Sequence, residues 1–281
     1  MKTKLILEVG SNHNGKINRC LKFIDLAKKL GCYSVKFQLF KINKLFSSEF
    51  LRKNKNIKNR IKTELPVNFI PIISKYCKKK NVKFSCTPFY LEAVDILKKH
   101  VDFFKIASYE LLWDDLLIKC AKTKKPVIIS TGMANFNEVK RAYSILKKNG
   151  CKKISVLHCV SSYPANISSC NLNSIDFLKK KLNCEVGWSD HTVDPLVIYS
   201  AINEHAAKIV EFHLDLDKKG WEFKQGKHCW LPHEIKKLLD FMNYKKKIDG
   251  KFNKKFSHSE IKERFFRADP TDGLRPLKRI R

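Results

Sequence analysis

Long apolar runs are missing from this sequence of 281 residues. No stretch approaches the roughly 20 apolar residues that a membrane-spanning helix needs, and no apolar segment follows the initiating Met. We therefore expect no membrane partner, no secretory signal peptide and a cytoplasmic location. Hydrophobic residues still make up 43% of the chain, which is enough for a substantial core.

The sequence also lacks any Cys-x-x-Cys pair, although it contains ten cysteines. The cysteines are scattered, and several of them, such as Cys86 and Cys159, fall in predicted core strands. This distribution favours free buried thiols in a reducing compartment over a framework of disulfides.

Acidic residues are scarce, with 27 Asp and Glu against 57 Lys and Arg, so the net charge is +30. Such a charge is typical of nucleic-acid-binding proteins. The lysine runs, however, fall at predicted helix C-termini, where the helix dipole favours cations. They are Lys78–Lys80, Lys98–Lys99, Lys147–Lys148, Lys179–Lys181 and Lys245–Lys247. We therefore expect a solvated face and no nucleic-acid partner, and keep a basic nucleic-acid-binding barrel as an alternative.

Eight apolar, β-branched runs, each followed by a helix-like stretch, organise the chain. They are Lys4–Val9, Tyr33–Gln38, Val82–Cys86, Asp102–Ala107, Pro126–Ser130, Ile154–Cys159, Glu185–Trp188 and Lys208–His213. This repeat predicts an α/β fold, a (β/α)8 TIM barrel, over residues 1–248 and a basic C-terminal tail over residues 249–281. The segment 41–65 is predicted to hold a short helix or to act as a lid, and Pro66 to open the next helix.

Polar or ionisable residues stand where the strands should end, which is the active-site face of such a barrel. They are Glu8, Lys36, Gln38, Thr87, Lys105, Ser108, Ser130, Ser161, Asp190, His191 and His213. Their grouping at one end of the predicted barrel indicates an enzyme.

Two histidines, His191 and His213, follow the seventh and eighth strands, which are neighbours in a barrel. Two neutral imidazoles there could share one metal ion. A plain hydrogen-bonded pair of histidines is the alternative. Asp190 could be a further ligand or a partner of one.

Two lysines, Lys36 and Lys105, are bracketed by hydrophobic residues inside predicted strands. A buried cation needs an anionic partner or an exit to the barrel mouth. Together with nearby hydroxyls they predict a pocket for phosphate or carboxylate, and two lysines reaching solvent are the alternative. Glu8 could orient a substrate, take a proton or simply pair with Lys36.

Taken in order, eight segments resemble the N-acetylneuraminate (sialic acid) synthase family. They are Glu8-Val-Gly-Ser-Asn-His-Asn-Gly15, Val35-Lys-Phe-Gln38, Ser85-Cys-Thr-Pro-Phe89, Phe104-Lys-Ile-Ala-Ser108, Ile129-Ser-Thr-Gly-Met133, Leu157-His-Cys159 with Tyr163-Pro164, Gly187-Trp-Ser-Asp-His-Thr192 and Val210-Glu-Phe-His213.

This resemblance implies a barrel enzyme that condenses phosphoenolpyruvate with an N-acylated amino-sugar aldehyde, such as N-acetylmannosamine, and releases phosphate. It implies a divalent metal, with Mn²⁺ expected and Mg²⁺ or Co²⁺ as alternatives, held by His191 and His213. It places phosphoenolpyruvate contacts at Lys36, Thr87, Lys105, Ser108, Ser130 and Ser189, and sugar contacts at Gln38, Tyr163 and Asp190, with Glu8 near the reacting centre. Another phosphoenolpyruvate-dependent sugar-acid synthase is the alternative within this class.

The chain also departs from the family pattern. Ser161 stands where relatives often carry Asn, and the loop after His213 lacks the family's Gly-Pro-Asp, where we expect Glu222 to replace the acid. The tail is too short for the family's usual C-terminal antifreeze-like domain, which contacts the sugar's acyl group. We expect an arginine of the tail to replace that contact, with a solvated tail as the alternative. A homodimer is possible, and His228 receives no role.

Overall fold

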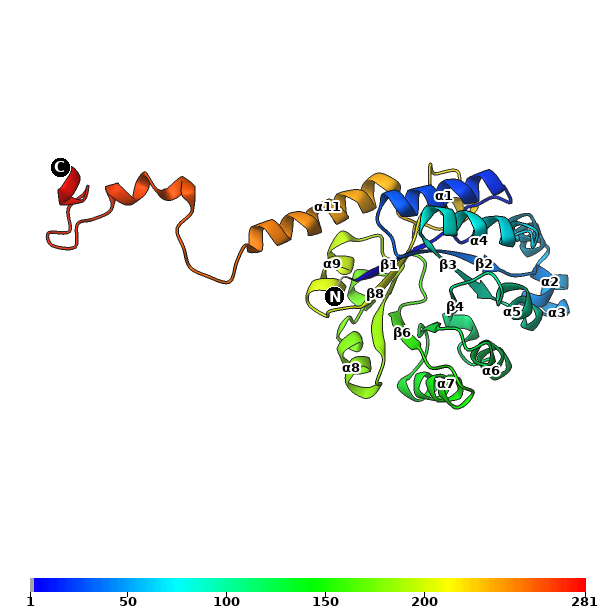
Figure 1. The fold of residues 1–281 in the computed structure, drawn as a ribbon. Coiled ribbons are helices and arrows are strands. Elements are labelled where there is room, and N and C mark those ends of the chain that lie inside the picture. The colour runs from blue at the N-terminus through cyan, green and yellow to red at the C-terminus, as the bar shows by residue number, and fades with distance from the viewer. Residues whose placement is uncertain (1–2) are drawn as a thin grey trace. The chain divides into compact units, whose positions relative to one another are not determined.

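The computed structural model describes residues 3–281, apart from the side chains of Lys55, Lys58 and Lys246. Eight parallel strands form a closed barrel in the order of the sequence, with β8 pairing back onto β1 (Figure 1). The strands are β1 (Lys4–Glu8), β2 (Ser34–Leu39), β3 (Lys83–Pro88), β4 (Phe103–Ile106), β5 (Val127–Ser130), β6 (Ile154–Cys159), β7 (Glu185–Asp190) and β8 (Ile209–His213). The predicted (β/α)8 barrel is confirmed.

Helices surround the barrel and connect successive strands. The connecting helices are α1 (Ile17–Lys29), α4 (Phe69–Lys80), α5 (Leu91–Leu97), α6 (Asp114–Lys122), α7 (Phe136–Lys148), α8 (Asn173–Lys181) and α9 (Pro195–Asn203), and α11 (Pro232–Asp249) follows β8. Shorter elements occupy loops: α2 (Ile42–Leu45), α3 (Ser48–Lys53), α10 (Trp221–Gln225), and the 3₁₀ turns η1 (Lys55–Thr63), η2 (Ser108–Glu110), η3 (Ile167–Ser169), η4 (His258–Glu260), η5 (Glu263–Phe266) and η6 (Lys278–Ile280).

Local sequence explains where several helices begin. Asn135 caps α7 by accepting from the Glu138 N–H while the Glu138 side chain accepts from the Asn135 N–H. Asp194 caps α9, and Pro195 occupies the first helical turn. Pro66 does not open α4 as predicted. Its carbonyl instead accepts from the Phe69 N–H in a turn, so the helix begins three residues later.

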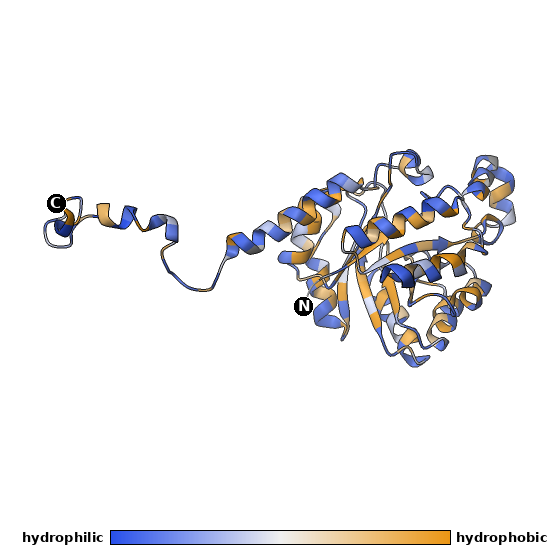
Figure 2. Cartoon of the chain, turned by 45° about the horizontal axis from the view of Figure 1, so that its top comes forward, coloured by the Kyte–Doolittle hydropathy of each residue, from blue (hydrophilic) through white to orange (hydrophobic). Residues whose placement is uncertain are grey.

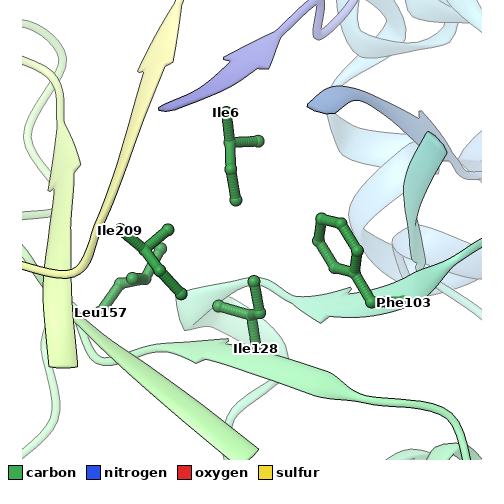
Figure 3. Packing of buried hydrophobic residues seen from close by; sticks show 5 residues of the cluster. All are labelled: Ile6, Phe103, Ile128, Leu157 and Ile209. Atoms are coloured by element: carbon green, nitrogen blue, oxygen red, sulfur yellow. The ribbon is translucent and has the colours of Figure 1, made fainter. Parts of the chain in front are cut away.

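The barrel interior is filled at one level by five apolar side chains from five strands. They are Ile6, Phe103, Ile128, Leu157 and Ile209, and Figure 3 shows them converging. We call this group the plug. In Figure 2 the strands are largely hydrophobic in colour, whereas hydrophobic and hydrophilic segments alternate along the helices. This pattern is that of a packed barrel core rather than a pore.

The segment 41–65 forms the short elements α2, α3 and η1, so the predicted short helix is present. Phe40, Ile42 and Leu51 pack in a small core of their own beneath it. The segment therefore has apolar contacts that anchor it beside the barrel.

The chain divides into two units, of which the first ends at Asp240 and the second comprises Phe241–Arg281. In the second unit Arg281 pairs with Asp272, and the Arg264 guanidinium lies 3.8 Å from the centre of the Phe256 ring. The boundary expected after residue 248 and the expected contact from a tail arginine stay predictions. Among the described residues all ten cysteines are free, and no helix has the length and apolarity of a membrane span.

Candidate active site

The alternation of strand residues positions the functional side chains. In a strand, residues two apart face the same side, so the residue two positions after each plug residue also faces the barrel interior, one level nearer the C-terminal mouth. These residues are Glu8, Lys105, Ser130, Cys159 and Glu211. The apolar plug therefore forms the floor beneath a layer of polar and ionisable groups.

A cavity of about 710 Å³ opens above this layer. Its walls include most of the residues expected from the sequence: Lys36, Gln38, Lys105, Ser108, Ser130, Tyr163, Ser189, His191, His213 and Glu222. The C-terminal ends of the strands and the loops that follow them thus bring together side chains distributed over nearly the whole barrel sequence.

The two buried lysines belong to one chain of charges. Lys36 Nζ lies 2.8 Å from Glu8 Oε2 and 3.4 Å from Glu211 Oε1, while Lys105 Nζ lies 3.7 Å from the same Glu211 oxygen. Burial disfavours the charge on Lys36, but Glu211 and Glu8 outweigh it and raise the pKa of this lysine. Burial lowers the pKa of Lys105, and Glu211 offsets only part of that effect. Lys105 is therefore the cation with more to gain from a bound anion.

Hydroxyl groups surround the two ammonium groups. Lys105 Nζ donates to Ser130 Oγ at 2.6 Å, and Lys36 Nζ donates to Thr87 Oγ1 at 3.3 Å. Ser108 Oγ accepts from the Gly132 N–H at 2.9 Å. Such donors and acceptors suit the oxygens of a phosphate or carboxylate.

Ser161 lies beside this group but is not one of the cavity's lining residues. Its Oγ is buried and has no hydrogen-bond partner among the described residues. A Cβ at Gly132 would come within 2.1 Å of that oxygen and 2.9 Å of Ser108 Oγ, so glycine is needed for the two serines to approach the loop.

Glu8 contacts three of its neighbours. Its Oε1 accepts from the Gly10 N–H at 3.0 Å and from Gln38 Nε2 at 2.7 Å, and its Oε2 faces Lys36. The arrangement is the ion pair considered as one possibility from the sequence. Gln38, expected to contact the sugar, also orients this carboxylate.

Three histidines and Tyr163 form an aromatic group at the other side of the cavity. The ring centres of His191 and His213 are 5.1 Å apart, and His228 lies 4.9 Å from His213. His191 Nδ1 lies 2.7 Å from the Val160 carbonyl oxygen and must donate to it, so the lone pair is on Nε2. Burial lowers the pKa of His191 and of His213, which keeps both imidazoles neutral near pH 7.

These imidazoles fit a divalent metal. Neutral imidazole with a second hydrogen bond that fixes its tautomer is the usual form of a metal-binding histidine. In addition, the buried His213 Nδ1 has no hydrogen bond among the described residues, although Glu222 Oε1 lies 2.6 Å away. The carboxylate is thus close to the nitrogen without lying on its hydrogen-bond direction.

Asp190 is not brought to the cavity. Its carboxylate accepts from the indole N–H groups of Trp188 and Trp230, at 3.1 and 3.0 Å, and from Thr192 and the Val193 N–H. It lies one residue after Ser189, which faces the cavity, so strand alternation turns it to the other side. The expected catalytic or sugar-binding role of Asp190 therefore has no geometric support. Its hydrogen bonds instead connect the end of β7 to neighbouring residues outside the cavity.

The residues that line the cavity and were not expected from the sequence include Glu110, Glu211, Arg60 and His228. Glu211 could have been found, because it stands two residues before His213 on the same strand face. Arg60 lies in η1, far from any strand end, with its guanidinium 5.3 Å from the Trp221 ring and its buried Nε unpaired among the described residues. No sequence signal marks Arg60 or His228.

Such a barrel mouth, with an anion pocket facing a group of neutral imidazoles, defines a class: enzymes that act on anionic substrates with help from a metal. Residues 23–254 match the NeuB family, and the chain belongs to that family. It is accordingly a phosphoenolpyruvate-dependent transferase that forms a carbon–carbon bond.

Individual relatives agree with this assignment. The chain is 36% identical to N,N'-diacetyllegionaminic acid synthase of Campylobacter jejuni, covering 93% of this chain and 81% of that protein. It is 31% identical to N-acetylneuraminate-9-phosphate synthase of Drosophila melanogaster, covering 83% and 65%. A crystal structure of N-acetylneuraminic acid synthetase from Leptospira borgpetersenii in complex with citrate superposes with a TM-score of 0.80 at 31% identity, covering 94% and 90%.

Glu110 generates a prediction about stability and pH. Its Oε2 is buried without a hydrogen-bond partner among the described residues, and burial raises its pKa from 4.5 to about 7 although Lys105 opposes this. A raised carboxyl pKa favours the protonated folded state, so stability is lost as pH rises towards about 7. Glu110→Gln should therefore be more stable than the wild type, by a margin that grows by about 2 kcal/mol between pH 5.5 and pH 8.

Urea unfolding of both proteins at the two pH values, without added metal or substrate, measures this margin. A margin that stays constant, or that shrinks as pH rises, would show that Glu110 is already ionised in the folded protein at the lower pH.

Proposed function

We propose that this chain condenses phosphoenolpyruvate with an N-acylated amino-sugar aldehyde, such as N-acetylmannosamine, to give a nonulosonic acid and phosphate. The observation that carries the proposal is Lys105, a buried ammonium on the cavity floor that touches Ser130 and remains only partly compensated by Glu211. The acceptor sugar is inferred from the names of the relatives and from the polar groups at the cavity mouth.

The charge balance of the cavity explains why a metal is needed. Lys36 and Lys105 are balanced in number by two carboxylates, Glu8 and Glu211, so the floor alone offers little net charge to phosphoenolpyruvate, which carries both a phosphate and a carboxylate. Glu222 adds a further carboxylate near the imidazoles. A divalent cation beside His191 and His213 would supply the missing positive charge, and Arg60 at the cavity wall would add to it.

The reaction requires two reactants held in one mouth. Carbon 3 of phosphoenolpyruvate forms a bond to the aldehyde carbon, water adds at carbon 2, and the resulting tetrahedral species expels phosphate by breaking the C–O bond. Lys105, Ser130, Ser108 and Ser189 would hold the phosphate and carboxylate oxygens, while Glu8 keeps Lys36 in place. Fixing both reactants supplies much of the rate.

A bound divalent cation would polarise the aldehyde oxygen as a Lewis acid and assist the water that adds at carbon 2. We propose Mn²⁺ for this role, with Mg²⁺ and Co²⁺ as alternatives. His191 and His213 would hold it, because both are buried, neutral and adjacent.

The sugar would lie towards Tyr163, Glu222 and Arg60, which line the cavity. The unpaired Arg60 Nε could contact the acyl carbonyl, a role that the sequence suggested for an arginine of the tail. Arg60 is also a cation of the kind that a phosphorylated sugar would need, so such a sugar is the second candidate acceptor.

A phosphate-release assay tests the proposed function directly. The purified chain would be incubated with phosphoenolpyruvate, MnCl₂ and a panel of amino-sugar aldehydes, with and without a 6-phosphate. Phosphate release that depends on one sugar, with formation of the matching sugar acid, supports the proposal. Release that is independent of every sugar, or none at all, refutes it.

Removing the Lys105 charge should affect phosphoenolpyruvate far more than the sugar. Lys105→Met should raise the apparent KM for phosphoenolpyruvate by roughly 10- to 100-fold, because a charge-assisted contact worth about 1.5–3 kcal/mol is lost. The exposed Lys152, which precedes β6 at the other end of the barrel, offers Lys152→Met as a matched control. Unchanged phosphoenolpyruvate kinetics in Lys105→Met would exclude this role.

Metal and phosphoenolpyruvate should bind cooperatively, because each supplies charge that the other lacks. Isothermal titration of phosphoenolpyruvate into the wild type should show tighter binding with Mn²⁺ than without it. His191→Ala or His213→Ala should lose that difference and the metal-dependent activity while keeping the wild-type circular dichroism spectrum. If both variants kept the full difference in phosphoenolpyruvate affinity with and without Mn²⁺, the metal would not be bound by these two histidines.

A further inference from the structure

The loop that follows β8 brings an imidazole and a carboxylate to the two expected metal ligands. We propose that His228 and Glu222 are additional ligands, so that the metal is held by His191, His213, Glu222 and His228. The inference rests on the proposed function only in taking His191 and His213 as metal ligands.

Glu222 is placed between two imidazoles. Its Oε1 lies 2.6 Å from His213 Nδ1 and 2.9 Å from His228 Nε2. Its other oxygen, Oε2, accepts from the Ser11 N–H at 2.9 Å, which fixes the carboxylate and turns Oε1 towards the histidines. The donor atoms of His213, Glu222 and His228, together with Cys229, all lie within 4.8 Å of one another, a spacing that one ion can bridge. His191 is not a member of this set and is connected to it through its ring contact with His213.

Two of the three separations between the imidazole rings suit a common metal. A metal–nitrogen bond of about 2.1 Å places the centre of an imidazole ring roughly 3.2 Å from the ion. If the N–metal–N angle is roughly 90–110°, the centres of two bound rings are roughly 4.5–5.2 Å apart. The observed separations are 4.9 Å for His213–His228, 5.1 Å for His191–His213 and 6.1 Å for His191–His228. Two of the three fall inside that range, and the third requires a wider angle at the ion.

Ordinary hydrogen bonding accounts for only part of this group. His228 Nε2 hydrogen-bonds with Glu222 Oε1 at 2.9 Å, but the buried His213 Nδ1 has no hydrogen-bond partner among the described residues. Buried polar atoms are normally paired, and such exceptions call for an explanation such as an ion. His213 is also at least nine-tenths buried, so bulk water does not satisfy it.

Cys229 is the neighbour that we do not include. Asn12 Nδ2 already donates to its sulfur at 3.5 Å. Three imidazoles and a carboxylate favour a borderline divalent metal, such as manganese, iron, cobalt or zinc, over magnesium.

Pulsed electron paramagnetic resonance of the full chain loaded with Mn²⁺ counts the imidazole nitrogens bound to the ion. The wild type should show three, and His228→Ala should show two. Isothermal titration with MnCl₂ should give a Kd that is weaker in His228→Ala by about 10- to 100-fold. The matched control is His233→Ala, which removes an exposed imidazole five residues further along and should change neither quantity.

A second variant leaves the imidazole in the chain but displaces it. A Cβ at Gly226 would come within 2.5 Å of His228 Nδ1, while the φ of −141° at Gly226 is compatible with alanine. Gly226→Ala should therefore also lose one bound nitrogen.

Two bound nitrogens in the wild type, with an unchanged Kd in His228→Ala, would overturn this inference and leave the proposed metal pair intact. Failure of the wild type to bind Mn²⁺ at all would overturn both. If the number of imidazole nitrogens bound to Mn²⁺ falls in His228→Ala but not in His233→Ala, His228 is a ligand rather than a residue that only orients Glu222.

Discussion

The chain of buried charges Glu8–Lys36–Glu211–Lys105 is the constraint on which the site depends. Taking an ammonium group out of water is costly unless a carboxylate compensates for it, and removing one partner leaves the other uncompensated. Here Glu211 lies near both lysines, at 3.4 and 3.7 Å. The barrel can bury two cations above its plug only because two carboxylates from adjacent strands, β1 and β8, enter the same layer.

This compensation also limits what the site can do alone. A pocket whose lysines are already matched cannot attract a highly charged anion strongly, so anion binding has to be linked to the arrival of another cation. The neutral imidazoles of His191 and His213 provide a place for one without adding charge of their own. In the proposed function, substrate binding and metal binding are therefore coupled by electrostatics.

The sequence predicted the barrel and much of the floor because both follow from alternation within strands. Lys36 and Lys105 stood out as cations within apolar runs, and the structure places both inside the barrel. Asp190 was misplaced because its position at a strand end suggested the cavity, whereas alternation and two indole donors hold it on the other side. Arg60 and His228 could not be assigned to the site, because they reach the cavity from η1 and from the loop after α10. These segments lack the regular alternation of a strand, so the position of a residue in the sequence does not predict which way its side chain points.

Closure of the barrel and completion of the site are the same event. Strand β8 pairs with β1 in a register that sets Glu8 beside His213, and the following loop places Glu222 against Gly10 and Ser11. A Cβ at Gly10 would lie 1.6 Å from Glu222 Oε2, and the φ of +52° there is one that glycine adopts readily. The absence of a side chain at Gly10 in the loop after β1 thus leaves room for Glu222 from the loop after β8. Because the two segments are about 200 residues apart in sequence, the imidazole–carboxylate group can assemble only after the eighth strand has closed the barrel.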